Sequence, residues 1–229
     1  MRKLVIIPAY NEQGGIVKTV EDVKKYAPEF DYIVINDCST DKTLTVCREH
    51  GFPLVNLPVN LGIGGGVQTG YVYAFRNGYD IAVQFDGDGQ HNARYLNEMA
   101  DKLEREHLDM VIGSRYIKKE GFQSSGLRRL GIRYFTWLIK LITRQKITDP
   151  TSGMRMANRD VIEIYAKNYP KDYPEPESVV TILKKGKKVE EIPVQMNARE
   201  EGVSSISPKK SVYYMIKVTL AILIAALRR

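Results

Sequence analysis

Residues 83–91 read Val-Gln-Phe-Asp-Gly-Asp-Gly-Gln-His, which places two carboxylates directly after an apolar run. A glycine follows each aspartate, so the backbone can turn sharply there. At a strand end bent in this way, Asp86 and Asp88 can converge on one hard cation. Mg²⁺ and Mn²⁺ prefer oxygen ligands and leave other positions to water and substrate phosphates. The pattern indicates a metal site, and a hairpin turn, for which Asp-Gly is also a strong signal, is the alternative.

Short, mostly apolar runs precede or enter this stretch, and most lead into a polar or glycine-rich loop and then a helical pattern. The runs at 3–7, 32–35, 54–57 and 81–85 are short and apolar, as expected of buried parallel strands. Residues 16–26 repeat apolar side chains at helical spacing. Strands that alternate with helices predict an α/β fold with a doubly wound, mostly parallel sheet. The loops at the carboxyl ends of its strands are expected to form the site.

The remaining elements follow from the same patterns. Further strands are predicted over 109–113, 154–157 and 189–196. Helices are predicted over 16–26, 92–106, 126–146, 158–168 and 212–227. Three more are predicted to end at residues 49, 77 and 185, and Thr40 or Asp41 is expected to cap the helix that ends at 49. We expect one domain over 1–210 and a C-terminal membrane-associating helix over 211–229.

A glycine-rich loop follows the third predicted strand, with glycines at 62, 64, 65, 66 and 70. This spacing contains neither G-x-G-x-x-G nor a Walker lysine. A glycine-rich loop that opens a helix still lets a base or a phosphate approach backbone N–H groups, and we place Gly64 in that role. Close packing of the helix on the sheet is the alternative.

Composition limits the class of protein. The 229 residues are 43% hydrophobic, enough to fill a sizeable core, and the net charge of +7 implies anionic partners such as nucleotide phosphates, nucleic acid or a membrane surface. Cys38 and Cys47 have no metal-ligand spacing and are expected to be reduced thiols. The first apolar run meets Pro8 at once, unlike a signal peptide, so we expect a cytoplasmic protein.

Residues 126–146 mix apolar and aromatic side chains with arginines and lysines, and this segment has no acidic residue. This composition is typical of a helix that lies in a bilayer interface, and a core helix with arginines reaching to solvent is the alternative. Residues 212–227 are mostly apolar but fall short of the roughly 20 residues that span a bilayer. They predict a second interfacial helix or a packing helix.

Several motifs occur in a fixed order along the chain. They are Ile7-Pro8-Ala9-Tyr10-Asn11-Glu12, Asn36-Asp37-x-Ser39-x-Asp41, Asn60-Leu61-Gly62, the Asp86–His91 stretch, Gly113-Ser114-Arg115-Tyr116 and Asp149-x-x-Ser152-Gly153. Together they resemble the family-2 glycosyltransferases of GT-A fold, and within them the polyprenyl-phosphate glycosyltransferases related to dolichyl-phosphate mannose synthase.

This resemblance implies a site for a nucleotide diphosphate sugar. The residues expected to line it are Pro8, Ala9, Tyr10, Glu12, Asp37, Gly64 and Gly87. Tyr10 would lie near the base or ribose, Glu12 would accept from a ribose hydroxyl, and Asp37 would accept the imide N–H of the base. Asp86 and Asp88, with Gln90 alongside, would hold Mg²⁺ or Mn²⁺ on the diphosphate and neutralise the leaving group.

The resemblance also implies a lipid-phosphate acceptor. Arg115 and Arg129 would clamp its phosphate, because a guanidinium matches phosphate oxygens bidentately; a plain surface charge is the alternative for each. The expected reaction is an inverting transfer of a hexosyl unit, from UDP-Glc or UDP-GlcNAc, to undecaprenyl-type phosphate for cell-wall polysaccharide assembly. It would take place at the cytoplasmic face of the membrane, to which the protein would bind peripherally. A small membrane protein is a further candidate partner.

Three other functions compete with this one. A saccharide hydroxyl acceptor would need a carboxylate base, and Asp149 and Glu175 are the candidates for it. A non-catalytic sugar-nucleotide-binding subunit would not need the intact Asp86 and Asp88 pair. A nucleic-acid partner would use the basic surface but leaves these two carboxylates unexplained, so we expect no nucleic acid.

The chain departs from the mannose synthases in two places. Gly202-x-Ser204-Ser205 lacks the Ser-Lys pair expected there, for which Arg199, Lys209 or Lys210 could substitute. The segment 173–177, with the sequence Tyr-Pro-Glu-Pro-Glu, is more similar to bacterial relatives that act in cell-wall polysaccharide assembly.

Overall fold

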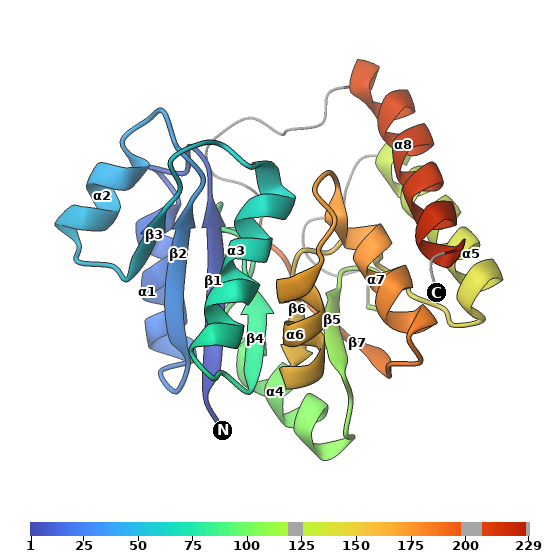
Figure 1. Cartoon of the computed structure of the whole chain (residues 1–229), viewed down its shortest axis with the longest axis horizontal. Helices are drawn as coiled ribbons and strands as arrows, with labels where there is room; N and C mark the ends of the chain where they lie inside the picture. Colours follow the sequence, from blue (N-terminus) through green and yellow to red (C-terminus); the bar gives the residue numbers. More distant parts are fainter. Residues whose placement is uncertain (119–125, 198–207, 228–229) are drawn as a thin grey trace.

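The computed structural model describes residues 1–118, 126–197 and 208–227 (Figure 1). Its centre is a seven-stranded sheet in the order β3-β2-β1-β4-β6-β5-β7. The strands are β1 (Lys3–Ala9), β2 (Asp31–Asn36), β3 (Leu54–Asn56), β4 (Ile81–Gln84), β5 (Met110–Ser114), β6 (Arg155–Asn158) and β7 (Val189–Pro193). Only β6 runs antiparallel to its neighbours in this sheet. The predicted mostly parallel α/β sheet is confirmed.

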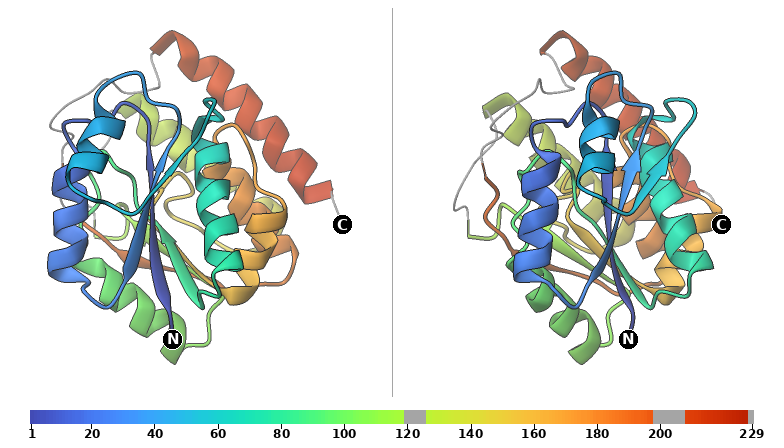
Figure 2. Two further views of the ribbon diagram at one scale, coloured as in Figure 1. Left: turned by 60° about the vertical axis from the view of Figure 1, so that its left-hand side comes forward. Right: turned by 90° about the vertical axis from the view of Figure 1, so that its left-hand side faces the viewer.

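Helices cover both faces of the sheet (Figure 2). They are α1 (Ile16–Tyr26), α2 (Thr43–Glu49), α3 (Gly62–Arg76), α4 (Tyr95–Arg105), α5 (Gly126–Thr143), α6 (Arg159–Lys167), α7 (Pro174–Lys184) and α8 (Pro208–Leu227). Side chains alternate along β1, so Leu4 and Ile6 join the apolar cluster under α3 and α6, whereas Val5 and Ile7 join the cluster under α1 and α4. Both halves of the core are thus built on one sheet.

Most element boundaries match the sequence prediction within a few residues, and the differences have local causes. Helix α5 ends at Thr143 rather than 146, because Arg144 adopts a left-handed backbone with φ of 63°. Helix α8 begins at Pro208 rather than 212, and proline is well suited to a first helical turn. The predicted cap of α2 is wrong: Lys42 occupies the cap position, although Asp41 Oδ1 accepts from the Thr43 N–H at 2.8 Å.

Helices α5 and α8 pack on α7 and on each other at the carboxyl side of the sheet (Figure 1). The inner face of α5 buries Phe135 and Ile139, and that of α8 buries Val218 and Ile222. The rings of Phe135 and Tyr214 meet edge to face at 5.8 Å. Each helix is therefore a packing helix on its inner face, as the alternative interpretation stated.

The outer sides of the same two helices expose large apolar side chains. We call this set the outer apolar face; it consists of Leu130, Trp137 and Leu141 on α5 and of Tyr213, Ile216, Leu220, Leu223, Ile224 and Leu227 on α8. Among the described residues, no helix combines the length and hydropathy needed to cross a bilayer.

Candidate functional site

The loops after β1, β2 and β4 meet at the carboxyl edge of the sheet, where parallel neighbouring strands end together. The Asp37 N–H donates to the Ala9 carbonyl at 2.9 Å, and the Gly87 N–H donates to the Pro8 carbonyl at 3.3 Å. A Cβ on Gly87 would lie 3.1 Å from that same Pro8 carbonyl. The structure thus brings together Pro8, Ala9, Asp37 and Gly87, as the predicted nucleotide pocket requires.

Asp37 is the acidic group of this cluster and is only 4% exposed. Its Oδ1 accepts from the Leu61 N–H at 2.7 Å, which ties it to the start of α3. A carboxylate offers about four acceptor positions, so this bond leaves capacity for an imide N–H.

Two other predicted pocket residues follow β1. Tyr10 is 47% exposed, and Glu12 is half-buried, with its backbone N–H bonded to Thr43 Oγ1 at 2.9 Å. Both lie on the loop that covers the Pro8 end of the strand. The contacts of these two side chains with the base or the ribose remain predictions.

The glycines of α3 have different reasons for lacking a side chain. A Cβ on Gly64 would lie 2.1 Å from the Pro170 carbonyl oxygen, so Gly64 packs against the backbone between α6 and α7. A Cβ on Gly66 would meet only ordinary contacts at 3.9 Å, with Asp37 and Pro8. Gly66, which the sequence did not single out, therefore faces the predicted nucleotide pocket, whereas packing accounts for Gly64.

Asp86 and Asp88 lie on the turn after β4, held at several points. Gln84 Nε2 donates to Asp86 Oδ1 at 3.1 Å, and the Asp86 N–H donates to His91 Nδ1 at 3.0 Å. The Gln90 N–H donates to Asp88 Oδ1 at 3.0 Å, so Gln90 contacts Asp88 through its backbone. The turn is therefore a fixed one.

The donor set at this turn fits a hard cation that is shared with a substrate. Asp86 and Asp88 are neither buried nor fully exposed. Within the described residues, no group of three or more His, Cys, Asp or Glu side chains could hold a metal ion. Mg²⁺ commonly takes only one or two carboxylates and completes its octahedron with phosphate oxygens and water, so the pair suits an ion that arrives with a diphosphate.

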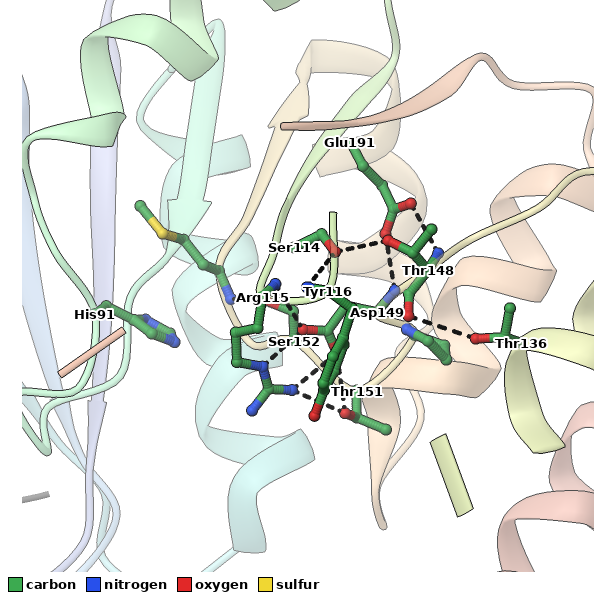
Figure 3. Close-up of polar contacts among 12 residues, drawn as sticks. His91, Ser114, Arg115, Tyr116, Thr136, Thr148, Asp149, Thr151, Ser152 and Glu191 are labelled. Carbon is green, nitrogen blue, oxygen red and sulfur yellow. Dashed lines mark hydrogen bonds and ion pairs between the residues drawn. The ribbon is translucent and has the colours of Figure 1, made fainter. Parts of the chain in front are cut away.

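Arg115 and Asp149 form the most buried charged pair described around the site (Figure 3). Arg115 Nε lies 2.7 Å from Asp149 Oδ2 and Nη2 lies 2.8 Å from Oδ1, while Nη2 also reaches Thr151 Oγ1 at 3.0 Å. Arg115 is 7% exposed and Asp149 is fully buried. Asp149 holds the pKa of the guanidinium above its usual value despite burial, which acts in the opposite direction.

A second carboxylate, that of Glu191, binds the backbone that carries Asp149. Glu191 on β7 accepts from the Thr148 N–H at 2.7 Å and from the Asp149 N–H at 2.9 Å (Figure 3). Burial, together with the nearby Asp149 charge, raises the pKa of Glu191. Ser114 and Thr148 hydroxyls share a bond of 2.6 Å beside it. The loop before β6 is thereby fastened to β5 and β7.

Arg155 is a fully buried arginine that the sequence reasoning missed. Its guanidinium donates to the carbonyls of Ser152 at 2.6 Å and Pro150 at 2.7 Å, and to Ser178 Oγ at 2.9 Å. It also donates to the backbone carbonyl of Glu175, in the first turn of α7. An arginine inside an otherwise apolar strand was the available signal, because such a charge needs partners when buried.

A cavity of about 350 Å³ lies beside α5. Its lining residues are Tyr116, Arg129, Ile132, Arg133, Thr136, Lys146 and Thr148. Three of these carry a positive charge and none is acidic, so the cavity is suited to an anion. Arg115 does not line it, although its guanidinium lies 5.4 Å from the Tyr116 ring centroid. Instead of the expected clamp of Arg115 with Arg129, the structure groups Arg129 with Arg133 and Lys146.

Arg199 and the segment 202–205 lie outside the described residues, and for Lys209 and Lys210 only the backbone of α8 is described.

The parallel sheet with one antiparallel strand and its loop-borne carboxylates is the GT-A fold, shared with solved glycosyltransferases. The chain belongs to glycosyl transferase family 2, whose sequence pattern matches residues 4–165. This confirms the family inferred from the ordered motifs.

Relatives with named activities cover nearly the whole chain. An undecaprenyl-phosphate mannosyltransferase of Micrococcus luteus is 27% identical, over 90% of this chain and 88% of its own. A UDP-N-acetylglucosamine–dolichyl-phosphate N-acetylglucosaminyltransferase of Methanococcus voltae is 26% identical, over 83% of this chain and 84% of its own. Glucosyl-3-phosphoglycerate synthase from Mycobacterium tuberculosis, solved with Mn²⁺, UDP and phosphoglyceric acid, has a TM-score of 0.75 at 18% identity, covering 100% of this chain and 79% of that one.

Proposed function

We propose that this protein transfers a hexosyl unit from a UDP-sugar to a polyprenyl phosphate at a membrane surface. The observation that carries the proposal is a row of side chains on α5. Arg129, Arg133, Trp137 and Leu141 are spaced four residues apart, so they follow one another along one side of the helix, and all four are exposed. The basic end of the row lines the anion cavity, and the apolar end belongs to the outer apolar face.

This row matches a ligand with an anionic head and an apolar tail. Twelve residues of helix extend about 18 Å, which is enough to separate a phosphate from the isoprene units that follow it. The phosphate would lie among Arg129, Arg133 and Lys146, and the tail would run along Trp137 and Leu141. Relatives that act on undecaprenyl and dolichyl phosphates support this class of acceptor.

The donor would lie in the predicted nucleotide pocket of Pro8, Asp37 and Gly66, on the side of the Asp86 turn opposite the acceptor. A divalent cation, when bound at Asp86 and Asp88, would supply positive charge to the diphosphate leaving group. The Mn²⁺ and UDP bound to the structural neighbour support this pairing. We propose Mg²⁺ or Mn²⁺ as the ion.

The chemistry would then depend on placement and charge. The acceptor phosphate is anionic near neutral pH, so its oxygen can attack the anomeric carbon opposite the departing diphosphate without a strong base. The rival reaction, with a saccharide hydroxyl, needs a carboxylate base. Both oxygens of Asp149 accept from Arg115, and its side chain is fully buried, which disfavours Asp149 in that role and leaves Glu175 as the candidate.

Where the acceptor is a membrane lipid, the protein must reach the bilayer. We propose that it binds peripherally, at the cytoplasmic face, through the outer apolar face and the neighbouring basic residues of α5. A small membrane protein on the same face is the second candidate partner. The role in cell-wall polysaccharide assembly is proposed from the likeness of residues 173–177 to bacterial relatives.

The test is an assay with defined substrates. The purified protein is incubated with undecaprenyl phosphate in detergent, Mn²⁺ and radiolabelled UDP-glucose, UDP-N-acetylglucosamine or GDP-mannose, and butanol-extractable label is counted. We expect label from a UDP-sugar. Arg133→Ala and Lys146→Ala should each raise the apparent KM for the lipid about ten- to a hundredfold, since one charge-assisted contact contributes about 1.5 to 3 kcal/mol.

Lys140→Ala is the matched control, because Lys140 is an exposed cation of the same helix that does not line the cavity. It should leave the KM for the lipid within about twofold. Transfer to a water-soluble saccharide, with no label in butanol and no effect of Arg133→Ala, would overturn the lipid-phosphate proposal.

A further inference from the structure

Gln84 is a fully buried polar residue at the end of β4, in the middle of the sheet. Its neighbours Val83 and Phe85 are apolar and buried on the opposite face. An amide removed from water costs free energy unless both its donor and its acceptor are bonded. A glutamine in this strand therefore calls for specific partners.

Both ends of the Gln84 amide are bonded. Nε2 donates to Asp86 Oδ1 at 3.1 Å, and Oε1 accepts from the Tyr169 hydroxyl at 3.4 Å. An ionised carboxylate only accepts, so the amide nitrogen must face Asp86, and the amide oxygen is left for Tyr169. The orientation of Gln84 follows from these two partners.

Tyr169 is itself held firmly. Its ring packs against Tyr165 at 4.9 Å and Tyr71 at 5.7 Å, and it is 4% exposed. Burial raises the pKa of Tyr169, which keeps its hydroxyl protonated and able to donate. A packed aromatic cluster under α3 and α6 thus fixes the hydroxyl that fixes Gln84.

The second oxygen of Asp86 is confined as well. A Cβ on Gly153 would lie 2.6 Å from Asp86 Oδ2, so the absence of a side chain there makes room for the carboxylate. His91 Nε2 lies 3.7 Å from the same oxygen. Asp86 Oδ1 is thus bonded to Gln84, while Oδ2 lies against Gly153 and near His91.

We infer that Gln84 is a positioning residue that fixes the Asp86 carboxylate for a divalent cation, and that Tyr169 fixes Gln84. The inference rests on the metal role of Asp86 in the proposed function. Carboxylates that bind metals are commonly oriented by hydrogen-bond donors behind them, and loss of such a donor typically lowers metal affinity about 10- to 100-fold.

The experiment measures Mn²⁺ affinity directly. Free Mn²⁺ is titrated by electron paramagnetic resonance in the presence of saturating UDP, for the wild type, Gln84→Met and Tyr169→Phe. Gln84→Met keeps the side-chain length and removes both hydrogen bonds, so we expect the Mn²⁺ Kd to rise about 10- to 100-fold. Tyr169→Phe keeps the ring packing and should shift the Kd in the same direction by a smaller factor. It also keeps the test open should Gln84→Met fail to fold.

Two matched variants separate positioning from core stability. Gln68→Met removes an amide that donates to the Ala166 carbonyl, and Tyr165→Phe removes a hydroxyl of the same cluster that donates to the Ser178 carbonyl. Both should leave the Mn²⁺ Kd within about twofold. A lower Tm in Gln84→Met with a wild-type Mn²⁺ Kd would make Gln84 a core residue only and overturn the inference.

Asp88→Asn distinguishes this failure from that of the proposed function. If the wild type binds Mn²⁺ and Asp88→Asn does not, an unchanged Kd in Gln84→Met and Tyr169→Phe rejects the positioning role alone. If the wild type with UDP binds no Mn²⁺, both the metal role and the positioning role are rejected.

Discussion

Arg115 and Asp149 form a bidentate ion pair in which the aspartate is fully buried, with N–O distances of 2.7 and 2.8 Å. The Arg115 backbone N–H also donates to Asp149 Oδ2 at 3.2 Å, so the backbone directly after β5 and the Arg115 side chain bind the same carboxylate. This pair joins the end of β5 to the loop before β6. Removing either member leaves the other as an uncompensated buried charge.

Asp149→Ala should therefore lower the free energy of unfolding by about 3 to 5 kcal/mol. Urea unfolding followed by circular dichroism measures it. Glu163→Ala is the control, because Glu163 pairs with Lys167 on the exposed side of α6 and such pairs contribute less than about 1 kcal/mol. An Asp149→Ala protein with wild-type stability and no activity would instead assign Asp149 to catalysis.

The long sequence separation of this pair explains what the sequence could and could not predict. Apolar runs and helical spacing are local patterns, so they located the strands, the helices and the Asp86 turn. The partner of Arg115 lies 34 residues away, and only the antiparallel return of β6 between β4 and β5 brings it near. For the same reason, local patterns could not assign four acceptors to Arg155 or group Arg133 and Lys146 with Arg129.

Helices α5 and α8 illustrate a different limit. Their composition predicted apolar and basic helices, but it left membrane binding and domain packing as alternatives. The structure shows that the inner face of each helix packs on the domain while the outer face stays exposed. Hydrophobic periodicity gives the number of apolar positions, whereas their division between core and surface depends on neighbours that fold elsewhere in the chain.

A pair of glycine variants tests the two roles assigned to the start of α3. Gly64→Ala forces a Cβ against the Pro170 and Lys171 carbonyl oxygens, at 2.1 and 2.3 Å, and should cost about 1 to 3 kcal/mol of stability. Gly66→Ala meets no close contact and should gain up to about 1 kcal/mol from helix propensity. It should nevertheless weaken UDP binding by calorimetry, because its methyl group points between Asp37 and Pro8. Unchanged UDP binding would remove Gly66 from the pocket.

The partly buried Glu191 predicts a pH dependence of stability. Its pKa is raised by burial, so the folded state binds this proton more tightly than the unfolded state. Its contribution to stability is present below the ordinary carboxyl value of 4.5 and is lost as pH rises through the folded pKa. Glu191→Gln has no carboxyl proton to lose. The difference in unfolding free energy between variant and wild type should therefore change as pH rises from 4.5 through the raised pKa of folded Glu191. Glu190→Gln, at an exposed residue, is the control. Parallel curves of stability against pH for Glu191→Gln and the wild type would contradict the raised pKa of Glu191.

Asp37 predicts which bases the donor pocket accepts. A carboxylate can accept N3–H of uracil or N1–H of guanine, but adenine offers no such imide. Calorimetry should show UDP binding most tightly, and Asp37→Ala should weaken it about ten- to a hundredfold. Tighter binding of GDP would reject the preference for UDP. If ADP bound best, Asp37 would have no role in reading the base.

The outer apolar face predicts how the protein attaches to membranes. Deleting residues 212–229 is a poor test, because Val218, Ile222 and Ala225 are buried and their loss would open the core. Ile216, Leu220 and Leu223 are 58%, 54% and 42% exposed, so their replacement leaves the packing face intact. Variants of these three residues separate membrane contact from folding.

The triple variant Ile216→Ser, Leu220→Ser, Leu223→Ser should bind anionic liposomes at least a hundredfold more weakly, since each exposed side chain would contribute roughly 1 kcal/mol or more on insertion. Flotation with liposomes measures this. Val59→Ser, at a residue 57% exposed and distant in sequence from α5 and α8, is the control and should float like the wild type. High salt should release only part of the wild-type protein, because salt screens the contribution of Arg129 and Arg133 but not buried apolar area. A wild-type protein that never floats would exclude direct insertion and leave a membrane-protein partner as the occupant of this face.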